Sequence, residues 1–207
     1  MFQNRVDPLG NIICTSARGT WMGNRGQLHG KGKIILRSFK HRAWIICLLE
    51  FKCRDRPIMS PDLWTELFFF DEVTAFAAGH RPCFECRRDA ADLFKAAWLK
   101  GNAGYGFTKK TSIQEIDKVL HHERIDTTGR KVTYEAAIKN LPDGTFIQIA
   151  SEPYLVMKEL IFHWTPFGYE KGITDPTLKK VNVLTPQSIV NAFCSGYIPQ
   201  IGVYLYN

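Results

Sequence analysis

The chain has 207 residues, of which 45% are hydrophobic and 23% are charged, with a formal net charge of +7. This composition suits a globular protein of one domain or two small ones, and no apolar run reaches the roughly 18 residues of a membrane span. The chain begins Met-Phe-Gln-Asn-Arg, without the apolar stretch of a secretory signal. We therefore expect a cytoplasmic protein without a membrane partner, whose six cysteines are thiols or metal ligands rather than disulfides.

The positive charge is concentrated at the N-terminus. Residues 1–56 hold eleven Lys and Arg against three Asp and Glu, a net charge of +8, so the rest of the chain sums to −1. A polyanion would be attracted mainly to this region. We expect DNA or RNA, or another phosphate-rich molecule, to bind there; the alternative is a solvated basic face without a partner.

Glycines and short apolar runs organise the first part of the chain. Six glycines in residues 10–32 predict tight turns and loops. Strands are predicted at residues 34–39, 44–51 and 66–70, the first two joined near residues 40–42. Asp71 then has the position of an N-cap for a short helix over residues 72–78, which Gly79 would close.

The second part of the chain alternates helices and strands. Helices are predicted over residues 87–100 and from Ser112, which has capping-box spacing, to about His122; a loop over residues 101–111 separates them. Strands are predicted at residues 145–149, 154–164 and 181–184. A last helix would run over residues 187–195, with Thr185 as its cap.

These elements predict an α+β fold in which mainly antiparallel strands and a few short helices are organised around a zinc knuckle. Residues 101–111 contain several glycines and lysines and predict a surface loop, which is where we expect a domain boundary. The two parts would be residues 1–103, the basic region with the knuckle, and residues 104–207, an α+β region. One continuous domain is the alternative.

The knuckle lies in the run Ala-Ala-Gly-His-Arg-Pro-Cys-Phe-Glu-Cys-Arg-Arg at residues 77–88. The spacing of Cys83 and Cys86 lets both sulfurs point at one ion, and zinc takes four such ligands in a tetrahedron. A redox pair is the less favoured interpretation, because no parallel strand of a thioredoxin-like unit precedes the motif.

The other two ligands must come from elsewhere in the chain. The leading choice is Cys47 and Cys53, which follow the second predicted strand and would complete a site of four thiolates. His80 is the rival, in place of Cys47 or Cys53, and the wider set of candidates also contains His29, His41 and Cys14.

Residues 70–86 resemble the end of the Ada-type metal-binding module, found in bacterial repair proteins that accept methyl groups from DNA phosphotriesters. The resemblance rests on a short helix ending in Ala-Ala-Gly, followed by Arg-Pro-Cys-x-x-Cys. It implies four cysteine ligands, one of them the methyl acceptor, whose counterpart here is Cys53 or, less well, Cys47. The chain departs from the pattern in the spacing of this first pair and in His80, which replaces an aromatic residue. The segment Arg18–Gly26 is also reminiscent of bacterial proteins, without implying an activity.

Three functions follow from these features. The first is a zinc-binding, nucleic-acid-associated protein. The second is an enzyme, either a methyl acceptor at a zinc thiolate or an acid–base catalyst using His121 and Glu123. The third is a non-catalytic interaction module that zinc stabilises. Two further segments carry weaker signals: Arg18, Asn24 and Arg25 could bind phosphate, and the aromatic turn at residues 163–169 could stack a base. A tight structural turn and a buried aromatic corner are the favoured interpretations of these two segments.

Overall fold

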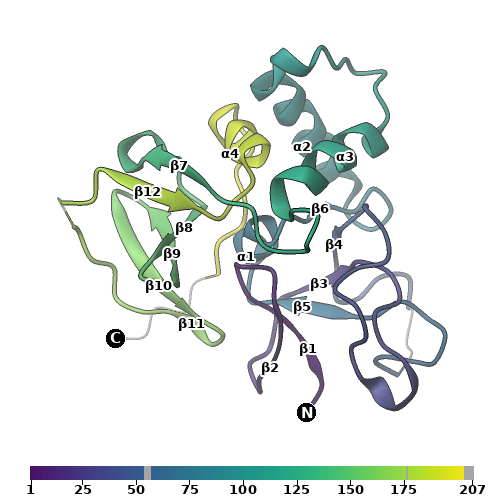
Figure 1. Cartoon of the computed structure of the whole chain (residues 1–207). Helices are drawn as coiled ribbons and strands as arrows, with labels where there is room; N and C mark the ends of the chain where they lie inside the picture. The colour runs from purple at the N-terminus through teal and green to yellow at the C-terminus, as the bar shows by residue number, and fades with distance from the viewer. Residues whose placement is uncertain (54–56, 176, 203–207) are drawn as a thin grey trace.

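The computed structural model describes residues 1–53, 57–175 and 177–202, and their strands form two six-stranded sheets (Figure 1). In spatial order the first sheet contains β2 (Ile12–Cys14), β1 (Gln3–Val6), β5 (Leu67–Phe69), β3 (Trp21–Asn24), β4 (Ile45–Cys47) and β6 (Arg81–Pro82). The second contains β11 (Gly168–Tyr169), β10 (Leu160–Thr165), β9 (Glu152–Met157), β8 (Thr145–Ile149), β12 (Lys180–Val183) and β7 (Tyr134–Ala137).

Most neighbouring strands are antiparallel. The second sheet is antiparallel throughout, whereas the first contains two parallel pairs, β1 with β5 and β4 with β6. The expected α+β fold with mainly antiparallel strands is therefore confirmed.

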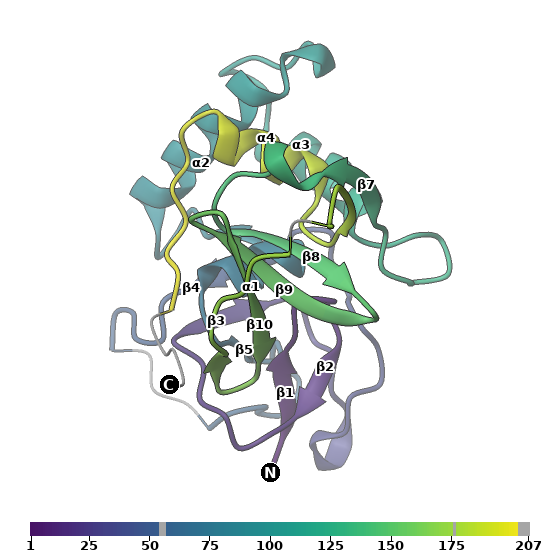
Figure 2. The same ribbon diagram turned by 90° about the vertical axis from the view of Figure 1, so that its left-hand side faces the viewer.

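Four helices accompany the sheets: α1 (Glu72–Ala77), α2 (Arg88–Gly101), α3 (Ile113–Arg124) and α4 (Gln187–Cys194). Short 3-10 turns occur at Lys31–Lys33, Ala103–Tyr105 and Ile138–Asn140. Helix α1 lies between the two sheets, and α2, α3 and α4 gather at one end of the molecule (Figures 1 and 2). No helix in the described part of the chain is long and apolar enough to cross a bilayer.

The buried side chains form three clusters. The largest lies between the first sheet and α1, α2 and α4, where Phe76 of α1 packs against Phe94, Phe193 and Tyr197. This cluster draws residues from both sides of position 103. The division into residues 1–103 and 104–207 stays a prediction.

The helices begin and end close to the predicted residues, but only one of the three predicted N-caps is confirmed. Asp71 accepts a hydrogen bond from the Thr74 backbone amide at 2.9 Å, as an N-cap should. Ser112 forms no such bond. Thr185 instead accepts one from the Phe146 amide at 2.9 Å, because its buried hydroxyl faces β8 rather than α4.

Two strand predictions were wrong. Residues 34–39 form no strand and contribute only an isolated bridge to His29, because Ile34 and Leu36 are 63% and 65% exposed and bury no apolar face. The strand predicted at residues 154–164 is a hairpin of β9 and β10. Its turn at Lys158 and Glu159 has φ values of 51° and 62°, a conformation that neither residue signals in the sequence.

Residues 3–24 contain three strands that were not predicted, β1, β2 and β3. One of them, β3, lies between β5 and β4, and a Cβ at Gly23 would approach Phe69 to 2.2 Å. Glycine is therefore required there for close packing rather than for a turn.

Candidate metal centre

Parallel pairing of β4 with β6 brings two of the cysteines together. Ile46 lies opposite Pro82 in the register, and the Cys83 amide donates to the Ile46 carbonyl at 3.0 Å. The next residue along β4 is Cys47. Cys47 and Cys83 thus leave adjacent parallel strands at the same edge of the sheet.

A tight turn between β6 and α2 adds the third sulfur. The Arg87 amide donates to the Cys83 carbonyl at 3.0 Å, and the Glu85 amide donates to Cys83 Sγ at 3.3 Å. This turn directs Cys86 back toward Cys83. The Sγ atoms of Cys47, Cys83 and Cys86 all lie within 4.8 Å of one another.

This arrangement is close to what a tetrahedral metal needs. Zn–S bonds of about 2.3 Å place two sulfurs of a tetrahedron roughly 3.8 Å apart, so adjustments of about 1 Å would close the three thiols around an ion. Cys47 and Cys83 are buried and Cys86 is partly exposed. The trio could therefore hold a metal ion at the edge of the first sheet, with a fourth coordination position left to another ligand.

The sulfurs also influence one another's ionisation. Hydrogen bonding from Cys47, aided by backbone amides, lowers the pKa of Cys83 to about 5 and also lowers the pKa of Cys86. The two neighbouring sulfurs correspondingly raise the pKa of Cys47. Because Cys86 lies just before α2, the partial positive charge of the helix N-terminus further favours thiolate. Thiolates are the form that metals bind.

Two buried ion pairs fix the backbone around the turn. Arg81 makes a bidentate pair with Asp117 of α3, with Nε and Nη2 each 2.8 Å from a carboxylate oxygen. Arg87 pairs with Glu72 of α1 at 2.6 Å, and its guanidinium lies 3.9 Å from the ring centroid of Trp21. The cysteine turn is thereby attached to two helices and to β3.

Gly79 sets the direction in which the chain enters β6. It ends α1 with φ of +84°, and its amide donates to the Phe76 carbonyl at 2.8 Å. A Cβ at this position would lie 2.5 Å from Cδ of Arg124. Both the backbone conformation and the contact therefore require glycine.

The structure does not bring every predicted ligand to this group. Cys53 is exposed in a turn after β4, with φ of 51°, and its sulfur is outside the trio. His80 is fully buried between Trp44 and Phe69, and its Nε2 accepts a hydrogen bond from Nε of Arg25 at 3.1 Å. Burial and the nearby guanidiniums lower the pKa of His80 well below its usual value, so the ring is neutral.

The remaining candidate ligands also lie apart. His29 is held by Thr65 at 2.6 Å and by the Ser60 carbonyl at 3.0 Å. Neither His41 nor Cys14 joins a group of metal-ligating side chains among the described residues.

The His121 and Glu123 side chains have separate partners. His121 Nδ1 lies 2.9 Å from Nη2 of Arg124, whereas Glu123 accepts hydrogen bonds from the Ser188 amide at 3.1 Å and hydroxyl at 2.5 Å. Burial lowers the pKa of His121 to about 4 and raises the pKa of Glu123. Glu123 binds the first turn of α4, so His121 and Glu123 do not form a pair for acid–base chemistry.

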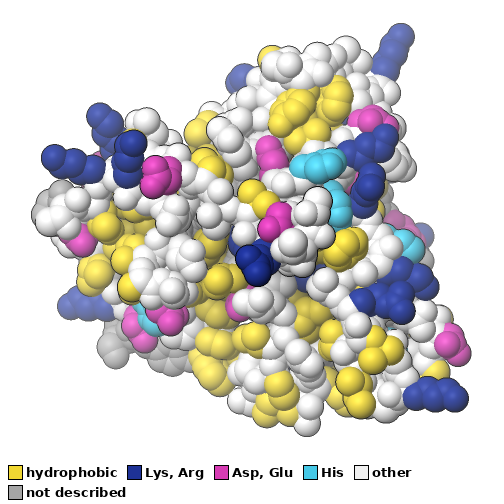
Figure 3. Space-filling model, in the orientation of Figure 1, with side chains coloured by type: hydrophobic (Ala, Val, Ile, Leu, Met, Phe, Trp, Pro, Cys, Tyr) yellow, Lys and Arg dark blue, Asp and Glu magenta, His cyan; other side chains and the backbone are white. Residues whose placement is uncertain are grey.

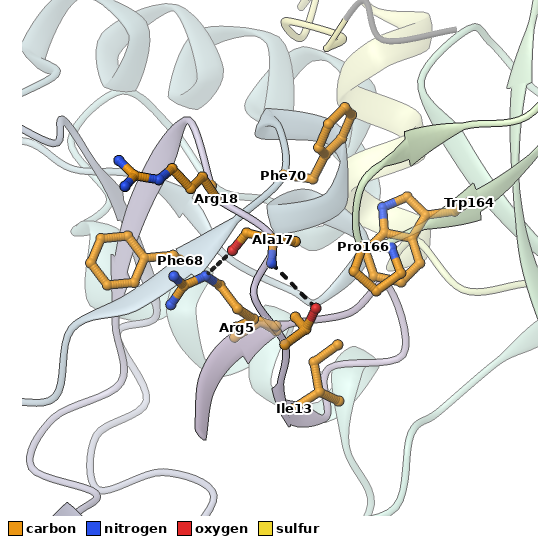
Figure 4. Close-up of a pocket in the computed structure, with 11 residues that line it drawn as sticks. Arg5, Ile13, Ala17, Arg18, Phe68, Phe70, Trp164 and Pro166 are labelled. Carbon is orange, nitrogen blue, oxygen red and sulfur yellow. Dashed lines mark hydrogen bonds between the residues drawn. The ribbon is translucent and has the colours of Figure 1, made fainter. Parts of the chain in front are cut away.

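The aromatic turn borders two clefts. Trp164 and Pro166 line the first opposite Arg5, which donates to the Ala17 carbonyl at 2.6 Å, while Arg18 extends away from Trp164 (Figure 4). The volume of this cleft is about 10 Å³, room for about one water molecule. His163, Trp164, Thr165 and Pro166 also line a second cleft of about 400 Å³, so base stacking at this turn stays a prediction.

Comparison of the chain with protein-family models, with curated proteins and with solved structures finds no match. What the site can do must therefore be argued from its own geometry.

Proposed function

We propose that the protein binds zinc through Cys47, Cys83 and Cys86. The observation that carries this proposal is the grouping of three sulfurs within 4.8 Å, drawn from segments 36 residues apart in the chain. Thiolate ligands select zinc, copper(I) or iron–sulfur clusters over hard cations such as magnesium, and a tetrahedral mononuclear site of this kind suits zinc. The metal would connect β4 with the turn that precedes α2.

Cobalt substitution tests the site directly. Cobalt(II) added to metal-free protein should give the visible absorption of a tetrahedral thiolate complex, and zinc should displace it. Cys47→Ser, Cys83→Ser and Cys86→Ser should each weaken this absorption strongly, whereas Cys194→Ser, a change at an exposed cysteine, should not. Equal spectra in all four variants would exclude the trio as the ligand set.

Cys53 is the proposed fourth ligand. It follows Cys47 by six residues and its thiol is exposed, so it is free to approach a metal held by the other three sulfurs. Cys53→Ser should shift the cobalt absorption and lower metal affinity by less than loss of Cys83, because one of four ligands would be replaced by water. A spectrum identical to that of the unaltered protein would assign the fourth position to another group.

We further propose that the protein associates with nucleic acid, as the resemblance to the Ada-type module implies. The support is electrostatic: six Lys and Arg of the N-terminal region are exposed, namely Arg18, Lys31, Arg37, Lys40, Arg42 and Lys52. Lys and Arg side chains are visible over the loops that connect β3 to β5 (Figure 3). Cations on an accessible surface attract phosphate backbones without regard to sequence.

A salt titration with a matched control tests this association. Binding to single- and double-stranded oligonucleotides should weaken linearly in a plot of log affinity against log salt. A triple variant of Lys31, Lys40 and Arg42 to Ala should lower the affinity and flatten the slope. The control replaces Lys100, Lys109 and Lys110, three exposed lysines at and beyond the end of α2, by Ala. Equal losses in both variants, or no binding at low salt, would contradict a specific basic face.

Methyl transfer is a second candidate function, favoured by the exposed thiol of Cys53, six residues after Cys47 in the chain. In the reaction that the resemblance implies, a cysteine thiolate attacks the methyl carbon of a phosphotriester. An S–CH3 bond forms, the O–CH3 bond breaks, and the phosphodiester leaves as an anion. After incubation with methylated DNA, mass spectrometry should find one added methyl group on Cys53 or Cys47. If neither cysteine is modified, the protein is a zinc-stabilised binding module without this activity.

A further inference from the structure

A second feature, separate from the sulfurs, is a cationic cleft between the N-terminal strands and the segment that joins α3 to β7. Its volume is about 660 Å³, within the range of about 300–1,000 Å³ found for small-molecule sites. Arg25, Arg124, Lys131 and Trp44 line it, together with apolar side chains that include Ile12 and Ile35. Lys or Arg side chains are visible at the centre of this face, where the α3–β7 segment crosses (Figures 1 and 3).

Two arginines of the cleft are stacked on one tryptophan. The guanidinium carbons of Arg25 and Arg124 each lie 3.9 Å from the centroid of the Trp44 ring. The Trp44 indole donates to the His41 carbonyl at 2.9 Å, which fixes the ring. The cluster is therefore rigid, with two positive charges held close together.

These charges are buried without a compensating carboxylate. Arg25 and Arg124 are each 1% exposed, and no Asp or Glu among the described residues lies within ion-pair distance of either guanidinium. Their hydrogen bonds go to neutral acceptors: Arg25 to the Gly10 carbonyl at 3.0 Å, and Arg124 to the Gly79 carbonyl at 2.8 Å. Within the described part of the chain, Nη2 of Arg25 and Nε of Arg124 have no hydrogen-bond partner.

The acidic groups closest to the cluster have other partners. Asp7 accepts hydrogen bonds from the Asn11 amide at 2.8 Å and side chain at 2.9 Å. Asp117 is occupied by Arg81 in the bidentate pair described above. Lys131 donates to the Ala77 carbonyl, so it adds a third cation without a carboxylate partner.

An unpaired buried charge costs several kcal/mol, and three that converge on one cleft repel one another as well. Burial, with the neighbouring guanidiniums, lowers the pKa of Lys131 to about 7, and burial lowers the pKa of Arg25 to about 9, whereas the Asp7 carboxylate acts on both in the opposite direction without offsetting the shift. An anion in the cleft would relieve both the desolvation and the repulsion. Arg and Lys donors converging on one point suit phosphate oxygens especially well.

We propose that this cleft binds a small phosphate monoester, with the phosphate group beside Arg25, Arg124 and Lys131 and the organic part against the apolar wall. The cleft is much larger than a phosphate ion, which argues for an ester over inorganic phosphate. Because Arg25 and Arg124 are buried in the wall of the cleft, the backbone of a nucleic acid lying on the surface does not reach them, whereas a small ligand that enters the cleft lies directly against them. This site is separate from the zinc centre, and it shares Arg37 with the basic face proposed above.

Calorimetric titration tests the site with matched pairs of compounds: ribose 5-phosphate against ribose, glycerol 3-phosphate against glycerol, and adenosine 5′-monophosphate against adenosine. We expect at least one ester to bind with a Kd below about 1 mM and more tightly than inorganic phosphate or acetate. The unphosphorylated partner should not bind. If no ester binds in this range, or if acetate competes as well as the esters, the proposal is wrong.

Variants place the binding within the cleft. Lys131→Met should weaken ester binding by at least about tenfold, with native circular dichroism confirming the fold. Arg18→Ala, a change at an exposed cation outside this cleft, is the control and should leave it unchanged. Equal affinities in the two variants would overturn the proposal. If an oligonucleotide binds equally to both variants and no ester binds, the cleft proposal is wrong, and phosphate binding belongs to the N-terminal basic face alone.

Discussion

Removing the carboxylate of Asp117 is expected to destabilise the fold more than any surface change on the same helix. Asp117 and Arg81 are 4% and 5% exposed at their side chains, and both hydrogen bonds between them measure 2.8 Å. In Asp117→Ala, the Arg81 guanidinium stays buried with Nε and Nη2 unpaired. Among the described residues, its other hydrogen bond goes only to the neighbouring Pro82 carbonyl.

The magnitude follows from this burial. Breaking a buried ion pair by removal of one partner costs about 3–5 kcal/mol, because a desolvated charge is left behind. Glu115 offers a control on the same helix: it pairs with Lys118 at 2.8 Å, but the two side chains are 43% and 51% exposed. Glu115→Ala should cost only about 0.3–0.5 kcal/mol.

Urea unfolding followed by circular dichroism measures both variants. The denaturation midpoint should fall strongly in Asp117→Ala and hardly in Glu115→Ala, with similar slopes. The double variant Arg81→Leu/Asp117→Leu should regain part of the lost stability, because no unpaired charge remains. A loss below about 1 kcal/mol in Asp117→Ala would refute the reasoning, since Arg81 would then have found another partner.

Further predictions concern the core, one turn and one cation. Phe76→Ala should cost about 3–5 kcal/mol of unfolding free energy, whereas Leu93→Ala, 66% exposed on α2, should stay within about 0.5 kcal/mol; urea unfolding of both decides. Gly79→Ala should cost at least about 1–3 kcal/mol through its positive φ and the contact with the Arg124 side chain, and a thermal melt equal to that of Gly104→Ala, where a Cβ meets nothing within 4 Å, would contradict this. The folded-state pKa of Lys131, about 7 against an ordinary 10.5, means that the unfolded chain binds more protons between these values. Stability should therefore rise with pH from about 7 to about 10, and Lys131→Met should reduce this rise in unfolding titrations; an unchanged slope would show that other groups cause it.

The Cys-x-x-Cys motif predicted two of the three clustered cysteines. Cys83 and Cys86 follow a local rule, since a two-residue spacing between cysteines directs both sulfurs to one side of a turn. Cys47 was also predicted, but its position depends on the register between β4 and β6. That register is a non-local property, because the backbone of residues far apart must pair. Spacing alone also does not decide the fourth ligand: Cys53 is exposed outside the trio and stays a prediction, whereas His80 is held by Arg25.

The fold class was predictable because several elements carry a local signal in the sequence. Amphipathic helices such as α2 and α3 carry their own periodic signal, and Asp71 carries a local capping signal that the structure confirms. Strands of three or four residues such as β1 and β3 carry almost none. Their stability comes from neighbours in the sheet.

The cationic cleft was beyond sequence reasoning. Arg25, Arg124 and Lys131 come from distant segments, and only the tertiary structure stacks two of them on Trp44. From the sequence alone, Arg25 is grouped with the Lys and Arg residues of the basic N-terminal region and is expected to be exposed like them. The structure instead buries it, and a buried cation has a different role from a solvated one.

The most direct test of the account is the metal content of the purified protein. Elemental analysis should find about one zinc per chain in the unaltered protein and in Cys14→Ser, and close to none in Cys83→Ser. Removal of the metal by a chelator should lower the thermal midpoint of the unaltered protein and leave that of Cys83→Ser unchanged. A folded, metal-free native protein whose stability does not respond to zinc would contradict the central claim.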